Sequence, residues 1–429
     1  MLSRRTLFAA VLVATLPLGC PGRDDVQAQP PPPDQPAPPG TSVRSSLAFN
    51  EAPAVDPALL AALTAGQVAL GAELLAQGDG NENQALSPVS MSVAFAMLSA
   101  GARGHTLAEL EGAMRFLPQT DLHLAMNALN AAFMNRDVPT SESQDGLVLR
   151  PVNQVFQQDG FDVESAFLDT LAERYNAGVR LMDFSGNPET ARVDINAWVE
   201  AQTNERIQDL LPVGSITDLT RLVLANALYL KAAWKMGFAE DATRDRTFHT
   251  PSGDVETAFV HGEVDHEKYA RIGDVDVLEL PFVGDAIVMD FIIGRNGASV
   301  DLVAIASQLD ALQPAGHHLQ VPKFRVKVPF DLKAGLSALG VNDLFLAGVC
   351  DLTGLQPDAN LYVSGAFHQT FVELNEKGVE AAAATAIVTN DASAPETLAL
   401  DEPFYFLIRD TATGAPLFLG HIVDPSQEG

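Results

Sequence analysis

The stretch that decides the fold is FVELNEKGVEAAAATAIVTNDASAPETLALDEPF, residues 371–404. It begins with FVEL, which is typical of a strand, and it leads into the apolar segment PFYFLIR, which is typical of another strand. About two dozen residues separate the two strands, which is long for a loop in a compact domain. Because loops of that length are usually functional or disordered, this segment is the first candidate for a functional site.

The front half of the segment has the composition of a strand that could lie in the middle of a sheet. It contains no proline, and its alternate residues Val379, Ala381, Ala383 and Thr385 are small and uncharged. Alanine is also the best helix former, so a short surface helix over 381–384 fits equally well. Composition leaves both possibilities open.

Helix signals are concentrated in the first half of the chain. Each expected helix start has a capping residue before a proline, or the spacing of a capping box. Glycines that fit the ends of these helices follow at intervals. The expected starts are Asp56-Pro57, Ser87-Pro88, Thr106 with Glu109, and Asn187-Pro188, and the expected ends are Gly101 and Gly178.

Strand signals follow in the second half of the chain. Residues 323–328 alternate between a basic and an apolar residue, and Val275, Val277 and the stretch 287–293 are rich in β-branched side chains. No internal repeat and no second linker interrupts this region. The sequence therefore predicts one large α+β domain, with early helices and later strands.

The chain is strongly acidic. It has 26 Lys and Arg against 55 Asp and Glu, a net charge of −29, and no run of three basic residues. Binding nucleic acid needs clustered basic side chains that displace counterions from phosphates, so no nucleic acid is expected as a partner. With 47% hydrophobic and 19% charged residues, the chain has the composition of a folded globular protein.

Sequence motifs for catalysis and for metal binding are absent from the chain. It lacks the nucleophile elbow, the phosphate loop, the dinucleotide fingerprint and the HExxH zinc motif, so no enzymatic activity and no cofactor are expected. His261 with His266, and the adjacent pair 317–318, do not have the spacing of helical metal ligands. Asp274 and Asp276 fit a solvated strand edge better than a calcium loop. No metal site is predicted.

Residues 1–20 have the features of an export signal. Two arginines precede an apolar run over residues 7–18, which has signal-peptide length and is too short to span a bilayer. The run stops at Gly19-Cys20, and a small residue before a cysteine resembles the lipobox of bacterial lipoproteins, so Cys20 is expected to carry a lipid. The alternative is an ordinary cleaved signal. Cys350 is the only other cysteine, and no disulfide is expected.

Residues 21–46 are rich in proline, glutamine, alanine and aspartate, without hydrophobic periodicity. This composition predicts a semi-extended tether, and the globular domain is expected over residues 47–429. A lipidated cysteine followed by such a tether would hold the domain off a membrane. We therefore expect a lipoprotein of the cell envelope, or an extracellular protein if Cys20 carries no lipid.

Residues 376–384 combine Glu, a variable residue, Gly, a small residue, Glu and four alanines, and this pattern resembles the hinge of a serpin. The remainder of the segment resembles the serpin reactive-centre loop. Three further blocks match in family order: SPVSMSVAFAMLSAGARGHT resembles the helix under the shutter region, LVLANALYLKAAWKMGF the central-sheet strand that ends at the breach tryptophan, and PFYFLIRDTATGAPLFLGHIVDP the carboxy-terminal signature. The resemblance covers about residues 57–425 and implies the serpin fold, with early helices on a large mixed central sheet, further sheets and an exposed loop.

The resemblance implies a single-use trap for serine proteases, with cysteine proteases as a second class of target. The loop is offered as a substrate, the protease forms an acyl-enzyme, and the front half of the loop then inserts into the central sheet. Residues 379–392 would carry the protease roughly 45 Å at about 3.3 Å per strand residue. Family spacing places the reactive bond at Ala392-Ser393, with Asp391 as the rival residue. An alanine suits the shallow pocket of an elastase-like or subtilisin-like protease.

The resemblance also implies roles for individual residues. The ordinary structural interpretation stays open for them as well, because Ser87 would cap a helix and Trp234 would be a core aromatic in any function. Val379 departs from the threonine or serine that is commoner in the family. The implied hinge residues are Glu376, Gly378, Val379, Glu380, Ala381, Ala382, Ala383, Ala384 and Thr385, the implied shutter residues are Ser87, Ser90, Asn226 and His368, and the implied breach residue is Trp234.

The alternative function is a non-inhibitory serpin that acts as a surface-anchored binding protein. Bulky, charged or proline residues at the inward-facing hinge positions would block insertion, and none is present, so inhibition is the favoured prediction. The protein is expected to act as a monomer. The early helices carry no basic cluster that would predict activation by heparin.

Overall fold

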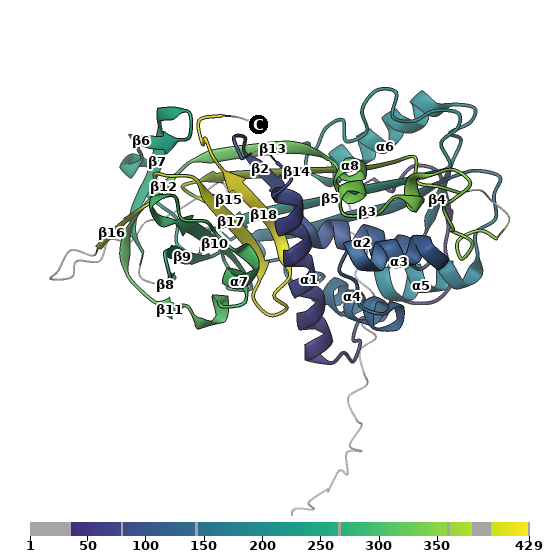
Figure 1. Cartoon of the computed structure of the whole chain (residues 1–429), viewed down its shortest axis with the longest axis horizontal. Coiled ribbons are helices and arrows are strands. Elements are labelled where there is room, and N and C mark those ends of the chain that lie inside the picture. Colours follow the sequence, from purple (N-terminus) through teal and green to yellow (C-terminus); the bar gives the residue numbers. More distant parts are fainter. Residues whose placement is uncertain are drawn as a thin grey trace, which may run out of the picture. The chain divides into compact units, whose positions relative to one another are not determined.

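The FVEL stretch at 371–374 lies in a seven-stranded mixed sheet, here called sheet A (Figure 1). The computed structural model describes residues 36–78, 80–141, 145–264, 267–357, 361–379 and 396–427, all within the unit Pro36–Gly429. The β3–β4 and β5–β14 pairs are parallel, and the other pairs of sheet A are antiparallel. In spatial order the strands are β1 (Thr41–Val43), β4 (Val179–Met182), β3 (Leu147–Gln158), β5 (Leu222–Ala233), β15 (Gly378–Val379), β14 (Gly365–Asn375) and β13 (Phe324–Asp331).

The other strands form two further sheets. Sheet B has the order β11 (Gln313–Pro314), β8 (Lys268–Ile272), β9 (Val275–Pro281), β10 (Ile287–Gly294), β17 (Phe404–Asp410), β18 (Pro416–Ile422) and β2 (Gln84–Leu86). Sheet C has the order β16 (Glu396–Ala399), β12 (His317–Pro322), β7 (Gly253–Val264) and β6 (Arg244–Thr250). The expected strands at 275–277 and 287–293 are confirmed as parts of β9 and β10, and the strand expected at 323–328 is confirmed as part of β13 from Phe324 onward.

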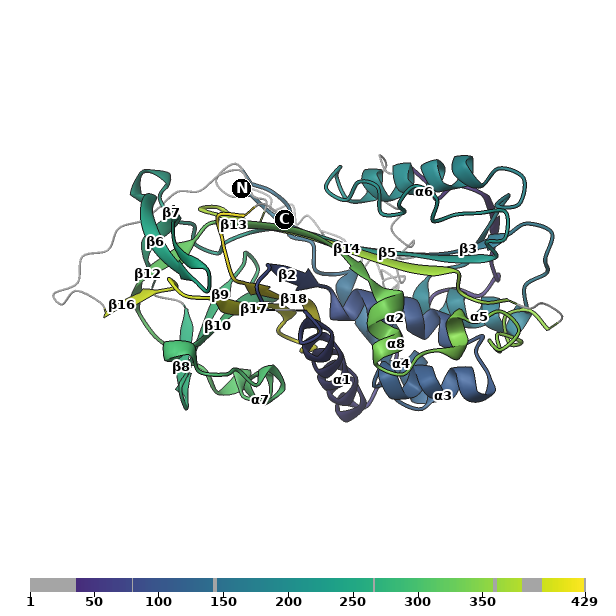
Figure 2. The same cartoon turned by 45° about the horizontal axis from the view of Figure 1, so that its top comes forward.

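Helices cover both faces of sheet A. Figure 2 shows α6 on one face, and α2, α3 and α4 on the other. The described helices are α1 (Pro57–Leu75), α2 (Pro88–Ser99), α3 (Gly104–Ala113), α4 (Gln119–Phe133), α5 (Ser165–Tyr175), α6 (Pro188–Gln202), α7 (Leu302–Ala306) and α8 (Leu332–Ala338), with 3-10 turns at Glu240–Ala242, Arg295–Gly297, Leu309–Ala311 and Asp343–Phe345.

Two hydrophobic cores hold these layers together. The larger core contains α2, every residue of which is buried between sheet A, β18 and α1. The smaller core lies between α6 and sheet A and includes Phe156, Trp198 and Phe371. Helix α1 is apolar and long enough to cross a membrane, but it packs against α2, α4 and β18, as a core helix does. Sheet A is therefore supported from both faces.

The expected helix starts at Asp56, Ser87 and Asn187 are confirmed. The Asp56 side chain accepts a hydrogen bond from the Ala58 amide at 2.9 Å, and Ser87 accepts one from the Ser90 amide at 3.3 Å. Asn187 precedes α6, but its side chain makes no capping bond to the helix. The proline at the first helical position is thus the more reliable part of this signal.

The capping box expected at Thr106 is wrong. Helix α3 begins earlier, at Gly104, and the Thr106 hydroxyl accepts a hydrogen bond from the Asp351 amide at 3.0 Å. The end expected at Gly178 is also displaced, because Asn176 adopts the left-handed conformation that ends α5 (φ 52°). The helix end expected at Gly101 lies two residues after Ser99, where α2 ends.

The fold begins before the expected boundary at residue 47. Strand β1 adds to the free edge of sheet A, where Thr41 pairs with Leu181 and Val43 with Val179. The Arg180 guanidinium also donates to the Gly40 carbonyl at 3.3 Å. Residues 36–46, expected in the tether, therefore lie against the domain, and a chain cut at residue 47 would lose an edge strand. Residues 21–35 lie outside the described part of the chain.

Asp276 does not lie on a solvated strand edge. Strand β9 is paired on both sides, by β8 and by β10, so Asp276 is buried. Its carboxylate accepts hydrogen bonds from the Tyr269 hydroxyl at 2.6 Å and from Arg271 Nε at 2.7 Å. The carboxylate is compensated by these partners rather than by water.

Candidate functional site

The described part of the predicted hinge already lies inside sheet A. Strand β14 ends at Asn375, the chain turns, and Gly378–Val379 form β15 between β5 and β14. Val379 pairs with Leu374 on one side and with Ala232 on the other, and its side chain is 2% exposed. The small, uncharged residue expected at this position therefore occupies a buried place in the sheet.

Below β15, strands β5 and β14 converge. They pair directly, in parallel, only where Gly365 to His368 meet Val223 to Asn226. Between these two points, residues 227–231 pair with β3, residues 369–373 pair with β13, and no described strand lies between them. Sheet A thus has a wedge-shaped division, which we call the β5–β14 gap, closed at His368 and held apart by β15 at Leu374.

Gly378 is the one residue type that fits at the top of this gap. Its φ of +137° is rarely adopted by other residues. A Cβ atom there would lie 2.2 Å from the Ala232 carbonyl oxygen and 2.8 Å from the Ala233 Cα. Because both contacts are with backbone atoms, they could not be relieved by a side-chain movement. The hinge glycine is required by close approach to β5.

Trp234 holds the turn that leads into β15. Its indole Nε1 donates to the Asn375 carbonyl at 3.1 Å, and its amide donates to the Lys377 carbonyl at 2.8 Å. Its ring stacks on Phe282 at a centroid distance of 4.5 Å. The residue expected at the breach therefore contacts the hinge directly.

Glu376 is the charged anchor of the same turn. Its carboxylate accepts a hydrogen bond from the Thr243 hydroxyl at 2.6 Å and forms an ion pair with Lys323 Nζ at 3.0 Å. Burial acts to raise the pKa of Glu376, but the hydrogen bonds from Thr243 and Lys323 outweigh it and hold the pKa below its ordinary value. Thr243 and Lys323 were not identified from the sequence, and neither carries a local signal for this role.

The four expected shutter residues lie together at the closed end of the gap. The Ser87 amide donates to His368 Nε2 at 3.0 Å, and His368 Nδ1 lies 3.0 Å from Asn226 Oδ1. The Asn226 amide nitrogen donates to the Ser90 hydroxyl and carbonyl, both at 2.7 Å. This network joins α2 to β5 and β14, the two strands that border the gap.

His368 is neutral in this network. Complete burial lowers its pKa to about 3, so Nε2 is free to accept from Ser87 while Nδ1 donates to Asn226. The sequence did not identify Asn153, which accepts a hydrogen bond from Asn226 in this cluster, or Thr370, whose hydroxyl donates to the Ala85 carbonyl at 2.8 Å two residues further along β14 from His368. No sequence signal marks them, because their partners lie far away in the chain.

The remaining expected site residues lie outside the described part of the chain. The described part of the chain stops at Val379 in sheet A and resumes at β16 in sheet C, where Glu396 pairs with His317. The segment between therefore connects two different sheets. The residues concerned are Glu380, Ala381, Ala382, Ala383, Ala384, Thr385, Asp391, Ala392 and Ser393, together with Cys20 and His266.

Among the described residues, one group has the side chains of a metal site. Donor atoms of His105, Glu109 and Asp343 lie within 4.8 Å of one another. However, His105 Nδ1 bonds Asp343 at 2.7 Å, and Glu109 accepts the amides of Asn342 and Asp343 at 2.9 and 2.8 Å. These bonds between α3 and the 3-10 turn account for the arrangement without an ion.

Comparison with known proteins agrees with this geometry. The family model for Serpin (serine protease inhibitor) matches residues 68–425. The leukocyte elastase inhibitor of Equus caballus is 34% identical over 368 residues, which cover 82% of this chain and 95% of that protein. Native protease nexin-1, solved with heparin, superposes with a TM-score of 0.74 at 26% identity, covering 86% of this chain and 100% of the other. The native thermophilic serpin tengpin superposes with a TM-score of 0.75 at 24% identity, over 89% of this chain and 97% of its own. Together with the β5–β14 gap and the strand Gly378–Val379 at its mouth, these matches establish that the chain belongs to the serpin (serine protease inhibitor) family.

Proposed function

We propose that this serpin inhibits its target protease as a single-use suicide substrate, by inserting the front half of its cleaved loop into the β5–β14 gap. The observation that carries the proposal is β15, which has the orientation of an inserted strand and is antiparallel to both β5 and β14. Insertion needs only the loop and the sheet of a single chain, so the protein acts as a monomer. Each molecule reacts with one protease and does not turn over, and the reaction needs no cofactor.

The register of β15 predicts the position of each inserted residue. Because Val379 pairs with Leu374 and Ala232, an antiparallel continuation places Ala383 opposite Thr370 and Leu228. Ala381 would lie opposite Val372 and Leu230 by the same count. All of these partners are buried on the side of the main core. The alternate small residues of the loop therefore match the positions where space is least.

An elastase-like or subtilisin-like serine protease is the proposed target. Its shallow pocket accepts an alanine, and the reactive bond is proposed at Ala392-Ser393, with Asp391 as the rival. The relative named leukocyte elastase inhibitor supports the same class of target. The small, buried Val379 argues against the alternative of a non-inhibitory binding serpin, because it leaves the mouth of the gap passable.

Cleavage of the loop should raise the thermal stability of the domain. Insertion of about ten residues adds about twenty backbone hydrogen bonds, because the new strand pairs on both sides, and at about 0.5 kcal/mol each they contribute together roughly 10 kcal/mol. We expect Tm to rise by about 20 °C or more. Scanning calorimetry of intact and loop-cleaved chain measures this shift, and a cleaved chain with the Tm of the intact chain would rule out insertion.

We also propose that Cys20 anchors the protein to a membrane of the cell envelope. Support comes from the short apolar run, the Gly19-Cys20 junction and the proline-rich segment that follows. Replacing Cys20 with serine should move the protein from the membrane fraction to the soluble fraction. The same change at Cys350, which lies within the fold, is the matched control. An unchanged distribution of the Cys20→Ser variant would show that the anchor lies elsewhere or does not exist.

A further inference from the structure

The loop between α6 and β5, residues 203–221, presents two aliphatic side chains to solvent. It contains tight turns at 212–215 and 217–220, each closed by a backbone hydrogen bond between its first and last residues, at 3.1 and 3.0 Å. Val213 and Leu219 occupy central positions of these turns and are 84% and 64% exposed. No other large hydrophobic residue in the described part of the chain is as exposed as either of them.

The two turns are firmly attached to the fold. The Leu211 carbonyl, just before the first turn, accepts hydrogen bonds from Arg192 and Asn196 of α6, both at 2.9 Å. Ile216, between the turns, is 5% exposed and belongs to the smaller core. Central turn positions are usually polar or glycine, and a single exposed aliphatic side chain needs no explanation. Two on consecutive, well-anchored turns indicate a contact surface.

This loop lies at the end of sheet A that is far from the mouth of the β5–β14 gap. It leads into β5 at Leu222, which pairs with the end of β3. Strand β1 starts at the same end, because Thr41 pairs with Leu181 on β4, which is parallel to β3. Val379 pairs with Ala232, ten residues further along β5 and therefore roughly 33 Å away. Figure 2 shows α6 and β16 towards opposite ends of the domain.

The chain that leads back to Cys20 leaves the domain beside α6. The Pro36 carbonyl accepts a hydrogen bond from Gln202 Nε2, on the last residue of α6, at 2.9 Å. The sixteen residues from Pro21 to Pro36 span at most about 55 Å when fully extended. A lipid on Cys20 would therefore keep the loop close to a bilayer, where even a weak contact is favoured by the high effective concentration.

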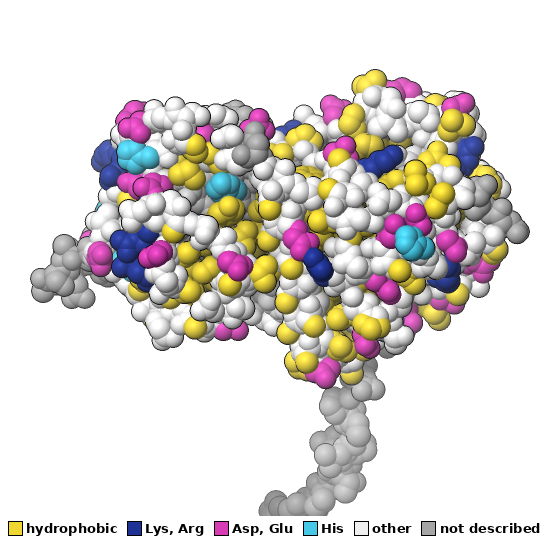
Figure 3. Space-filling view, viewed as in Figure 1, with side chains coloured by type: hydrophobic (Ala, Val, Ile, Leu, Met, Phe, Trp, Pro, Cys, Tyr) yellow, Lys and Arg dark blue, Asp and Glu magenta, His cyan; other side chains and the backbone are white. Residues whose placement is uncertain are grey.

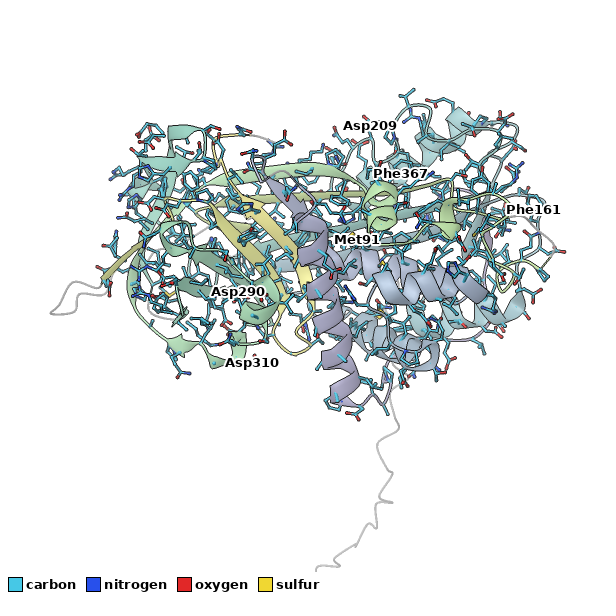
Figure 4. All side chains as sticks on the ribbon, in the orientation of Figure 1. Met91, Phe161, Asp209, Asp290, Asp310 and Phe367 are labelled. Carbon is cyan, nitrogen blue, oxygen red and sulfur yellow. The ribbon has the colours of Figure 1, made fainter. Side chains whose placement is uncertain are left out.

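The charge near the two turns favours a lipid surface without net charge. Figure 4 labels Asp209 in this loop, and Figure 3 shows Asp and Glu side chains spread across the face in view. Anionic lipids attract basic segments, whereas the loop has more acidic than basic residues. Two side chains also bury far less than the roughly 800 Å² per partner of a stable protein interface. The charged residues of the loop are Glu205, Asp209 and Asp218 against Arg206 and Arg221.

We propose that Val213 and Leu219 insert into the surface of a bilayer with zwitterionic headgroups, as a second contact beside the lipid on Cys20. This inference rests on the anchor proposed above. Moving aliphatic side chains from water to the acyl boundary of a bilayer is favourable. The contact places the α6 end of sheet A at the membrane. The mouth of the β5–β14 gap then faces away from the bilayer, where a protease in solution can reach the loop.

The test uses the whole chain, purified with its anchor and reconstituted in phosphatidylcholine vesicles that contain brominated acyl chains, which quench tryptophan on contact. Val213→Trp and Leu219→Trp place a probe on each turn, and the parent's own Trp198 and Trp234 are buried. Val303→Trp is the matched control, since Val303 is 44% exposed on α7, on the other side of sheet A from α6 (Figure 2). After subtraction of the parent signal, we expect quenching of both probes to be at least threefold greater than that of the control.

The two side chains should also support each other. Val213→Ser should reduce the quenching of Leu219→Trp at least twofold, whereas Val303→Ser should leave it unchanged. Flotation of the same vesicles separates the two proposals. A chain that floats, with both probes quenched no more than the control, would refute the bilayer contact and leave the anchor standing. A chain that does not float would refute the anchor and this contact with it. Unquenched probes in a chain that sediments as a dimer would instead assign the two turns to a contact between copies.

Discussion

Ala383→Arg should convert the protein from an inhibitor into a substrate of its protease. In the register set by β15, residue 383 enters the sheet opposite Thr370 and Leu228, whose exposed fractions are 0% and 2%. Burying a guanidinium there without a partner costs several kcal/mol, roughly 2 or more, so insertion slows and hydrolysis of the acyl-enzyme wins. The number of inhibitor molecules consumed per protease inactivated should rise at least tenfold.

Glu380→Arg is the matched control for this prediction. In the same register, residue 380 lies opposite Glu373 and Lys231, neither of which is fully buried, so an arginine there keeps a carboxylate partner and water. Ala382 is a poorer control, since its partners Phe371 and Tyr229 are both buried. Equal consumption by the parent, Ala383→Arg and Glu380→Arg would mean that the loop does not insert in this register. The free energy of unfolding of all three uncleaved chains should agree within about 0.5 kcal/mol.

Arg409→Met should cause the largest loss of stability among single changes outside the loop. Arg409 lies on β17, where Nε contacts Asp290 at 2.7 Å and a terminal nitrogen contacts Glu279. Asp290, labelled in Figure 4 on β10, is completely buried, and Glu279 is 3% exposed. Removing the cation leaves two carboxylates facing each other in the core of sheet B. We expect the free energy of unfolding at pH 7 to fall by about 3 to 5 kcal/mol.

The deficit of Arg409→Met should depend on pH. Burial raises the pKa of Asp290 from 3.8 to about 6, so between these values the folded state binds more protons than the unfolded state and stability falls as pH rises. Without the guanidinium the pKa of Asp290 rises further, so the variant takes up a proton on Asp290 as the pH falls, which removes the repulsion between Asp290 and Glu279. The loss in free energy of unfolding caused by Arg409→Met should therefore be smaller at pH 5 than at pH 7. Urea unfolding at several pH values measures this. Lys268→Met removes an exposed partner of Glu279 and should cost less than about 1 kcal/mol. The prediction would be contradicted if Arg409→Met lost no more free energy of unfolding than Lys268→Met, or if its loss did not change with pH.

Local signals predicted much of the fold. Ser87-Pro88 and the alternation at 323–328 specify a helix start and a strand through contacts within a few residues, and both are confirmed. The failures involve distant partners. Strand β1 forms because β4 offers a free edge, and Asp276 is buried because strands pair on both sides of it. Neither fact can be read from composition.

The residues of the candidate site were likewise predicted only in part. Family resemblance named Ser87, Asn226, His368 and Trp234, and the structure brings the first three together in one network and sets the last against the hinge. The resemblance did not identify the partners of Glu376, because Lys323 and Thr243 are 53 and 133 residues away from it in the chain.

The most direct test of the protease trap is a denaturing gel of the whole chain incubated with an elastase-like protease, followed by amino-terminal sequencing. We expect a band of the combined mass that survives denaturant, and a released fragment that begins at Ser393. A trypsin-like protease serves as the comparison, because its acidic pocket demands a cation that Ala392 does not offer. Clean cleavage without any covalent complex, across a panel of elastase-like and subtilisin-like proteases, would contradict the claim that this serpin traps its target.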